Sequence, residues 1–420
     1  MSRTVIKSGQ NLPEIQADLS EVVSKILQDV QKRGDLALHN YTLQFDRVER
    51  TQPMVSVEER ESAWKEVDDQ VKQDLEFAAG NIRAFAEKQK TALLEVEGEI
   101  LPGVTVGHRL IPVAAVGLYI PGGRYPLPST ALMGAIPAKI AGVKRVIACT
   151  PPDPYTGKVN PYSMVAMQVA EVDEIYCVGG VQAIGAMAYG TKSIPPVDMI
   201  VGPGNVYVTE AKRQVYGKVG IDMLAGPSEM LIVADESADP VWVAADLWAV
   251  AEHDPRAKAI LISTSPTLIQ RVEEEMAHQL PNLSTAEIAQ RSWRDNGWVY
   301  LVSNLAEATE LANEIAPEHL ELHTKDWRST WREYTNYGSL FLGAEAPRAF
   351  GDYTSGSNHI LPTMRTARMQ GGLWVGAFIK IVTYQWMTTA GAAILAPVTE
   401  RFAQLEGLVG HAFSAALRKQ

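Results

Sequence analysis

The first hundred residues repeat apolar positions with the period of an α-helix. The stretches at residues 14–35 and 56–90 place apolar side chains three or four positions apart and fill most other positions with charges. The first stretch ends at Gly34, and glycine commonly follows the last turn of a helix. The pattern therefore predicts charged, amphipathic helices over most of residues 1–103.

The pattern changes near residue 104, where short runs rich in β-branched residues begin to alternate with glycine turns and alanine-rich stretches. A strand-like run at residues 113–120 is followed by a helical stretch at 129–142 and by a second strand-like run at 144–150. Strands that alternate with helices in this way are typical of a parallel sheet. The fold class that this rhythm predicts is α/β.

The alternation of strand-like and helical stretches occurs twice along the chain, which indicates two domains. We expect one α/β domain at residues 104–225 and a second at residues 226–370. Residues 371–420 return to a helical pattern. The prediction is two incomplete Rossmann-like domains with parallel sheets, together with helical segments from the N-terminus (1–103) and the C-terminus.

The composition is that of a globular protein, and its charge limits the partners. The 420 residues are 46% hydrophobic and 21% charged, with a formal net charge of −11. This surplus of negative charge argues against binding to nucleic acid or to an anionic membrane. No uncharged apolar run is long enough to span a membrane, and the first residues lack the apolar stretch of a secretory signal. We therefore expect a cytoplasmic protein.

Two glycine turns follow strand-like runs and are candidates for ligand binding. They read "YIPGGRYP" and "IVGPGNVYVTEAK", and the second leads into a helical stretch. Glycine lets backbone N–H groups approach a phosphate, although neither turn is the full dinucleotide fingerprint, so a simple tight turn fits equally well. Tyr119, Gln182 and Asn205 add a stacking group and two amides near strand ends, where open α/β sheets bind ligands.

An acid and an imidazole stand side by side at Glu318 and His319, just after Pro317. Taken alone, this pair favours an ordinary helix or strand start with a solvated histidine. Among the other histidines, those in charged or loop-like surroundings are expected at the surface; they are His39, His108, His278 and His323. The histidines that lie beside apolar or glycine-containing stretches are His253, His359 and His411.

Several long motifs, taken in order along residues 104–411, resemble the histidinol dehydrogenase family. They read "VGLYIPGGRYPLPST", "VGGVQAIGAMAYGT", "VGPGNVYVTEAKRQV", "DMLAGPSEMLIVAD", "AEHDP", "APEHLEL", "FGDYTSGSNHILPT" and "EGLVGH". The resemblance implies an NAD-dependent, two-step oxidation of a primary alcohol, through an aldehyde, to a carboxylate. It also implies a zinc ion and a homodimer.

The resemblance gives the Glu318–His319 pair a catalytic meaning. It implies that His319 is the general base that takes the hydroxyl proton and that Glu318 activates water against the aldehyde. Each oxidation releases a proton, and the second needs a hydrated carbonyl. An imidazole has a pKa near the working pH, and a carboxylate reaches such a value by burial.

Further positions match the family's ligand contacts. The resemblance implies cofactor contacts at Tyr119, Gln182 and Asn205. It implies substrate contacts at Ser228, His319, Asp352, Glu406 and His411. It further implies that the C-terminal tail crosses to a partner subunit, so that Glu406 and His411 would complete the active site of that subunit.

The zinc ligands implied by the resemblance are incomplete in this sequence. His253, Asp352 and His411 are present, whereas the glutamine expected three residues before the first histidine is replaced by Val250. Positions three apart share a helix face, so Val250 is expected to turn an apolar side chain toward the metal. Three nitrogen and oxygen ligands with an open position still make a catalytic zinc site.

Two departures concern the substrate. Arg348 stands where histidinol-specific members usually have a glutamate, and residues 364–385 are more similar to the sulfopropanediol dehydrogenase branch of the family. We therefore expect Arg348 to contact substrate and the substrate to be a small anionic hydroxy compound, such as a sulfonate diol. The alternatives are a true L-histidinol dehydrogenase with an exposed loop arginine, and a non-catalytic protein that binds a small molecule.

Overall fold

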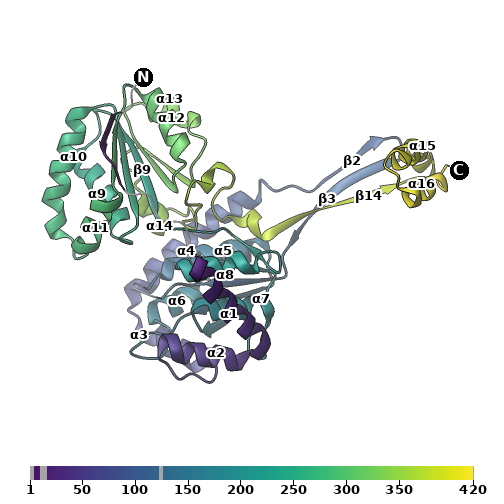
Figure 1. Cartoon of the computed structure of the whole chain (residues 1–420), viewed down its shortest axis with the longest axis horizontal. Helices are drawn as coiled ribbons and strands as arrows, with labels where there is room; N and C mark the ends of the chain where they lie inside the picture. Colours follow the sequence, from purple (N-terminus) through teal and green to yellow (C-terminus); the bar gives the residue numbers. More distant parts are fainter. Residues whose placement is uncertain (1–3, 10–16, 123–125, 420) are drawn as a thin grey trace.

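The computed structural model describes residues 4–9, 17–122 and 126–419 and contains two α/β domains and a long arm (Figure 1). The sheet of the first domain is wholly parallel, with the strand order β6-β5-β4-β7-β8. Its strands are β4 (Ala115–Tyr119), β5 (Arg145–Thr150), β6 (Glu174–Cys177), β7 (Met199–Val201) and β8 (Gly220–Ile221).

Helices cover both faces of this sheet. Those within the domain are α5 (Pro128–Ala141), α6 (Pro161–Val169), α7 (Gly180–Tyr189) and α8 (Val206–Val215). The N-terminal segment adds α1 (Ala17–Arg33), α2 (Asp35–Tyr41), the π-helical turn η1 (Thr42–Asp46), α3 (Val57–Glu66) and α4 (Asp69–Lys90). The apolar stripe of α1, with Val23, Leu27 and Val30, packs into the same core as Ile184 of α7.

The second domain repeats the strand order of the first. Its sheet runs β1-β11-β10-β9-β12-β13, and every strand is parallel to its neighbours except β1, which pairs antiparallel with β11. The strands are β1 (Thr4–Lys7), β9 (Glu229–Ala234), β10 (Lys258–Ser263), β11 (Trp298–Leu301), β12 (His319–His323) and β13 (Ser339–Leu342). Apart from β1, both sheets therefore have the 3-2-1-4-5 order of a Rossmann-like half, as the sequence predicts.

The helical elements of the second domain follow its strands in turn. They are α9 (Pro240–Ala251), α10 (Pro266–Gln279), η2 (Leu280–Asn282), α11 (Ala286–Asn296), α12 (Leu305–Ile315), α13 (Trp327–Thr330), η3 (Trp331–Glu333) and α14 (Arg348–Tyr353).

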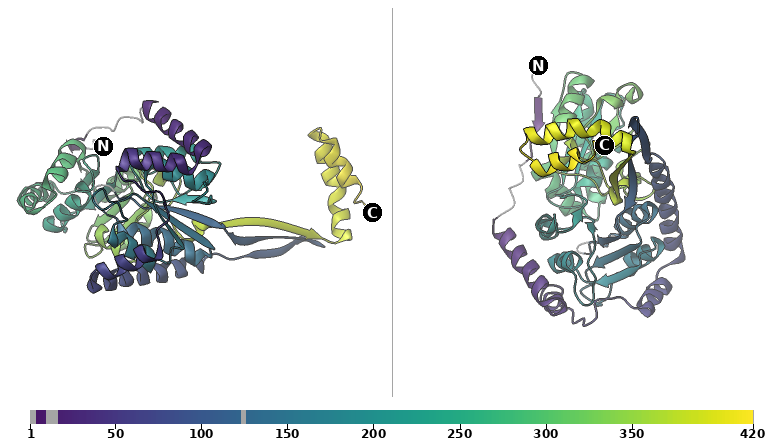
Figure 2. Two further views of the ribbon diagram at one scale, coloured as in Figure 1. Left: turned by 90° about the horizontal axis from the view of Figure 1, so that it is seen from below. Right: turned by 90° about the vertical axis from the view of Figure 1, so that its right-hand side faces the viewer.

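A three-stranded antiparallel arm projects from the two domains and carries the C-terminal helices at its tip (Figures 1 and 2). It contains β2 (Val96–Leu101), β3 (Val104–Pro112), β14 (Ile379–Met387), α15 (Thr389–Leu405) and α16 (Val409–Ala416). The turns η4 (Thr366–Arg368) and η5 (Val375–Phe378) precede β14, and η5 packs into the core of the first domain through Val375 and Phe378. Within the described part of the chain, no helix has the length and apolar character that a membrane crossing requires.

The arm and β1 correct the expectation that both terminal segments are helical. The N-terminal segment also contains β1, an edge strand of the second domain, and β2, which pairs with β3. The C-terminal segment contains β14, whose residues pair with β3 along its whole length. Its sequence "IKIVTYQWM" is rich in β-branched and aromatic residues, which favour a strand.

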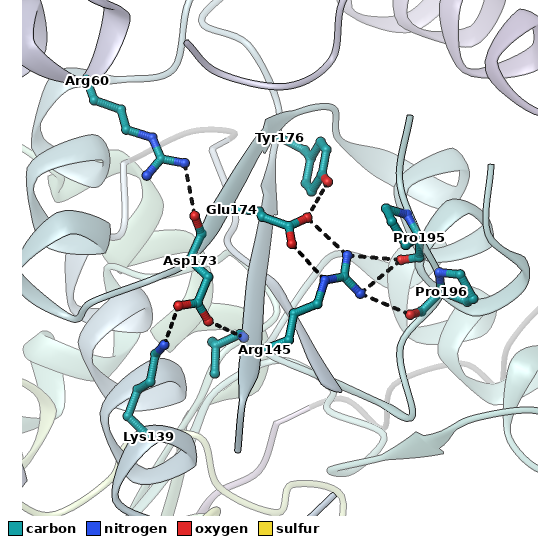
Figure 3. A network of polar contacts seen from close by, with 9 residues as sticks. Arg60, Lys139, Arg145, Asp173, Glu174, Tyr176, Pro195 and Pro196 are labelled. Carbon is teal, nitrogen blue, oxygen red and sulfur yellow. Dashed lines mark hydrogen bonds and ion pairs between the residues drawn. The ribbon is translucent and has the colours of Figure 1, made fainter. Parts of the chain in front are cut away.

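Ion pairs close the first sheet at the amino ends of β5 and β6 (Figure 3). The guanidinium of Arg145 donates to both carboxylate oxygens of Glu174, at 2.7 and 3.0 Å. Asp173 accepts from Lys139 at 2.6 Å and from the backbone N–H of Val146 at 2.7 Å. These structural contacts occupy the amino edge of the sheet. The carboxyl edge, where ligands bind in open α/β sheets, is free of them.

Candidate active site

The chain places Glu318 and His319 inside the second domain by breaking a helix directly before a strand. Helix α12 ends at Ile315 and is followed by Ala316, whose φ of 52° is left-handed, and Pro317 prevents any continuation of the helix. His319 then opens β12, which lies between β9 and β13. Glu318 and His319 are 7% and 1% exposed. The reading of a solvated histidine is therefore wrong, because β12 is covered on both sides.

The backbone of one residue of β9, Glu229, orients both side chains of the pair. The backbone N–H of Glu229 donates to Glu318 Oε2 at 2.8 Å, and the carbonyl of Glu229 accepts from His319 Nδ1 at 3.0 Å. A carbonyl can only accept, so Nδ1 carries a proton and the Nε2 of a neutral ring is free to act as a base. The same contacts hold Glu318 in reach of His319, with Oε2 3.4 Å from Nδ1.

Opposing effects set the proton affinity of His319. Burial and the positive charge of Arg348 lower its pKa, but Glu318 and Asp352 outweigh them and raise the pKa to about 9. Asp352 Oδ1 lies 3.5 Å from His319 Nε2. Because this pKa lies above neutral pH, the neutral ring that can act as a base at Nε2, the nitrogen that points away from the Glu229 carbonyl, becomes more populated as the pH rises toward 9.

Helix α14 brings Arg348 and Asp352 to this nitrogen. The two residues are four positions apart and form an ion pair, with Arg348 Nε 2.9 Å from Asp352 Oδ2. Glu321 of β12 fixes the start of the helix by accepting from the backbone N–H of Arg348. Arg348 is 4% exposed, so the alternative of an exposed loop arginine is wrong. Among the described residues its Nη1 has no hydrogen-bond partner.

His253 reaches the same place from the end of α9. Its Nε2 lies 3.5 Å from Nη2 of Arg348, and its side chain is exposed in the isolated chain. Val250, three residues earlier, is fully buried in the hydrophobic core between α9 and the sheet, together with Leu247 and Ala251. The position where the resemblance implies a metal ligand is thus part of the core here and offers no donor atom.

The three expected zinc ligands do not fit a metal ion as the chain stands. Zinc bound to His253 Nε2 and to an Asp352 oxygen would lie about 2 Å from each atom. The guanidinium of Arg348 already occupies the space between these two ligand atoms. Its Nη2 lies 3.5 Å from His253 Nε2, and its Nε lies 2.9 Å from Asp352 Oδ2. At an effective dielectric constant of 20, Arg348 repels each unit charge of an ion about 4 Å away by about 4 kcal/mol. It also neutralises the carboxylate that would attract the ion.

The expected cofactor contacts gather at the carboxyl edge of the first sheet. Tyr119 ends β4, and its hydroxyl accepts from the N–H of Gly180 at 3.1 Å. Gln182 is buried near the start of α7, and its Oε1 has no hydrogen-bond partner among the described residues. Asn205 caps α8, with Oδ1 accepting from two backbone N–H groups. Two helix N-termini and an unpaired amide oxygen fit a dinucleotide.

The glycine turns at this edge are only partly described. Residues 123–125 of the first turn lie outside the described residues. In the second turn, Gly202 has a φ of 113°, and a Cβ there would lie 2.2 Å from the carbonyl oxygen of Tyr119. Only glycine allows β7 to end so close to β4, at the point where the strand order reverses.

The amino edge of the second sheet faces this carboxyl edge. His359 links them, because its Nδ1 donates to the carbonyl of Asp352 at 2.9 Å and its Nε2 lies 3.5 Å from Thr130 Oγ1 at the start of α5. The amide of Asn358 also donates to the carbonyl of Met133, at 2.7 Å. Glu318 and His319 and the expected cofactor contacts are therefore held on facing edges.

Three predicted substrate contacts remain. One, Ser228, lies at the border of the site, and the other two, Glu406 and His411, lie far from it. Ser228 is half-buried and directly precedes Glu229. Glu406 and His411 are exposed, and the helices that carry them lie at the tip of the arm, away from both domains (Figure 1). Within one chain, these two residues do not reach the catalytic pair.

Sequence reasoning missed a buried polar cluster beside the pair. This cluster consists of Asp246 of α9 and of Glu321 and His323 of β12. One possible ligand atom from each residue lies within 4.8 Å of the others, a geometry that a metal ion could use. The surface position expected for His323 is wrong, because it is 3% exposed at the end of β12. Alternate residues of a strand share a face, so the spacing His319–Glu321–His323 was a usable signal.

Comparison with known proteins identifies the family. The histidinol dehydrogenase family profile matches residues 11–419. A histidinol dehydrogenase homolog of Shouchella clausii is 45% identical, covering 98% of this chain and 97% of its own length. The histidinol dehydrogenase of Rhodospirillum rubrum is also 45% identical, covering 96% and 92%.

A solved structure agrees with these relatives. The crystal structure of histidinol dehydrogenase from Elizabethkingia anophelis superposes with a TM-score of 0.93 at 37% identity, covering 97% of this chain and 94% of that one. Relatives named as the enzyme and as its homolog are equally similar to this chain, so similarity alone does not choose the substrate. The chain belongs to the histidinol dehydrogenase family, whose members are NAD-dependent dehydrogenases that oxidise an alcohol to an acid.

Proposed function

We propose that this protein oxidises a small primary alcohol that carries an anionic group, through the aldehyde, to a carboxylate. The first step converts R–CH2OH and NAD+ to R–CHO, NADH and a proton. The second converts R–CHO, water and NAD+ to R–COO−, NADH and two protons. The observation that carries the choice of substrate is Arg348, a buried cation beside the catalytic pair with an unpaired N–H donor.

The catalytic pair divides the proton transfers in this proposal. His319 takes the hydroxyl proton at Nε2, because its Nδ1 is tied to the carbonyl of Glu229. Glu318, oriented by the N–H of Glu229, takes a proton from the water that adds to the aldehyde. NAD, bound at Tyr119, Gln182 and Asn205, supplies the hydride acceptor in both steps.

Arg348 supports an anionic substrate on electrostatic grounds. A planar guanidinium binds a sulfonate or carboxylate through two N–H donors, and burial strengthens the interaction. Histidinol would instead bring an amine and an imidazole next to this positive charge. Histidinol is therefore the second candidate substrate. A non-catalytic binding protein is the third candidate, and the intact, oriented Glu318–His319 pair argues against it.

The zinc ion implied by the resemblance takes no part in this proposal. Its expected ligands are His253, Asp352 and His411, and Arg348 already contacts the first two. The proposed chemistry is therefore derived from the side chains of this chain and from NAD.

NADH formation from three substrates tests the proposed function. We expect 2,3-dihydroxypropane-1-sulfonate to be oxidised with a higher kcat/KM than histidinol or glycerol, glycerol being the neutral control of similar size. Replacing Arg348 with Gln should lower kcat/KM for the sulfonate at least tenfold more than it lowers kcat/KM for glycerol, because only the sulfonate loses its contact with a cation. Preferred turnover of histidinol would favour the second candidate, and tight binding without turnover of any alcohol the third.

We also propose that two copies of the chain form a dimer by exchanging their arms. The accessible surface of one chain is 21001 Å², whereas a compact monomer of this mass exposes about 16,000 Å². Large apolar side chains are exposed on the arm helices, among them Phe402, Leu405, Val409 and Phe413. A second copy of the two domains would cover them and receive Glu406 and His411 at its site.

A further inference from the structure

Three features of the site around Arg348 bear on metal binding. Its guanidinium contacts Asp352 through Nε and His253 through Nη2, so it joins the two atoms between which a metal would bind. Glu321 holds the backbone of Arg348, which fixes the base of the side chain. Position 250, where the family supplies a ligand, is a valine packed in the core.

The guanidinium also has a nitrogen without a hydrogen-bond partner among the described residues. Nη1 of Arg348 is buried and has no hydrogen-bond partner among the described residues, and the same is true of His319 Nε2. Buried polar atoms are normally paired, so two unpaired nitrogens in one place indicate a ligand that carries oxygen atoms. One nitrogen belongs to the expected base and the other to a fixed cation, which suits a substrate with a hydroxyl group and an anionic group.

We propose that the guanidinium of Arg348 is the resident cation of this active site and takes the place of a metal ion, so that the enzyme binds no divalent metal between His253 and Asp352. The anionic group of the substrate is held directly on Arg348, where a metal ion would otherwise anchor the substrate. His253 and Asp352 then serve to position the guanidinium. The claim about the metal does not depend on which alcohol is oxidised.

Metal analysis without substrate tests this proposal apart from the proposed function. The full chain is produced in zinc-supplemented medium and desalted without chelator, and zinc per chain is measured by mass spectrometry. We expect far less than one zinc per chain. Incubation with a strong chelator should also change the rate of alcohol oxidation less than twofold.

A charge-removing variant shows whether Arg348 is the excluding group. Arg348→Gln leaves the oxygen and nitrogen donors of Asp352 and His253 free, so the variant should take up zinc, as measured by competition with a chromogenic chelator. Arg271→Gln removes the same charge from an exposed position on α10 of the same domain and should take up none. Circular dichroism establishes that both variants fold.

Three outcomes would overturn the proposal. The first is one zinc per wild-type chain. The second is a wild-type activity that the chelator abolishes and zinc restores. The third is a folded Arg348→Gln that takes up no more zinc than Arg271→Gln. If Arg348→Gln does not fold, the proposal is still tested by the zinc content of the wild-type chain and by the effect of the chelator on wild-type activity.

Discussion

At the scale of single residues, the proposed chemistry rests on how the backbone of Glu229 holds Glu318 and His319. We predict that His319→Ala lowers alcohol oxidation about 10²–10⁴-fold, because it removes the general base. Glu318→Gln should slow aldehyde oxidation more than alcohol oxidation, because it removes the group that activates water. Single-turnover rates measured separately with the alcohol and with the aldehyde check this division, and equal losses in both steps would contradict it.

Asp46 offers a prediction about pH and stability. Burial raises its pKa to about 6, and its Oδ2 has no hydrogen-bond partner among the described residues. Because the folded pKa is above the unfolded value of 3.8, the stabilising effect of the protonated group is full below about pH 4 and is lost as the pH rises through about 6. Asp46→Asn should therefore raise Tm at pH 8 by a few degrees and change it less at pH 4.5.

A second carboxylate provides the control for Asp46. Glu236 is exposed in the loop after β9, so Glu236→Gln should leave Tm nearly unchanged at both pH values. A gain for Asp46→Asn that is equal at pH 4.5 and pH 8 would mean that the ionised carboxylate is not the source of the instability.

At the scale of elements, the turn after β7 sets the shape of the cofactor edge. A buried ion pair between Lys212 and Asp222 fixes this turn. The ammonium of Lys212 donates to the carbonyl of Gly202 at 2.9 Å, and the carboxylate of Asp222 accepts from its N–H at 2.7 Å. The backbone of Gly202 is thus held on both sides, close to the end of β4.

Alanine substitutions at two glycines distinguish the cost of a positive φ from the cost of a steric clash between a new Cβ and the backbone of β4. Gly202 and Gly217 both have positive φ, of 113° and 96°, and a non-glycine residue there costs about 1–3 kcal/mol. Only at Gly202 would the new Cβ collide with backbone, because nothing described lies within 4 Å of a Cβ at Gly217. Gly202→Ala should therefore lower Tm more and weaken NAD binding, as followed by calorimetric titration. Equal losses of Tm with unchanged NAD affinity would show that the close approach to β4 is unimportant.

At the scale of the whole molecule, the exposed arm predicts active sites shared between subunits. The variants His411→Ala and His319→Ala should each be inactive alone. After they are unfolded and refolded together, random pairing makes half of the dimers mixed, and one site in each mixed dimer has neither lesion. About a quarter of wild-type activity should then return. Mixed dimers that form but recover no activity would rule out a shared site.

Much of the architecture was readable from the sequence because local patterns decide it. Helical and strand periods predicted two parallel α/β domains, and the Glu318–His319 pair stood out within a long family motif. The terminal segments were harder to predict. The strand β1 is short and β14 lies in a mostly helical stretch, and both are stabilised as strands by partners far away in sequence. Strand pairing over such distances leaves little trace in a local pattern.

Local patterns in the chain were enough to predict the two α/β domains, the family and the residue types available for catalysis. Which of those residues lie in contact depends on long-range packing, which local patterns do not specify. The backbone of Glu229 contacts Glu318 and His319 across 89 and 90 positions in the sequence, and Arg348 contacts His253 across 95 positions. Contacts of this kind depend on the order of strands in a sheet and on the packing of helices over it. For that reason the sequence indicated an unusual arginine, whereas the fold placed its charge between His253 and Asp352, where the resemblance implies a metal ion.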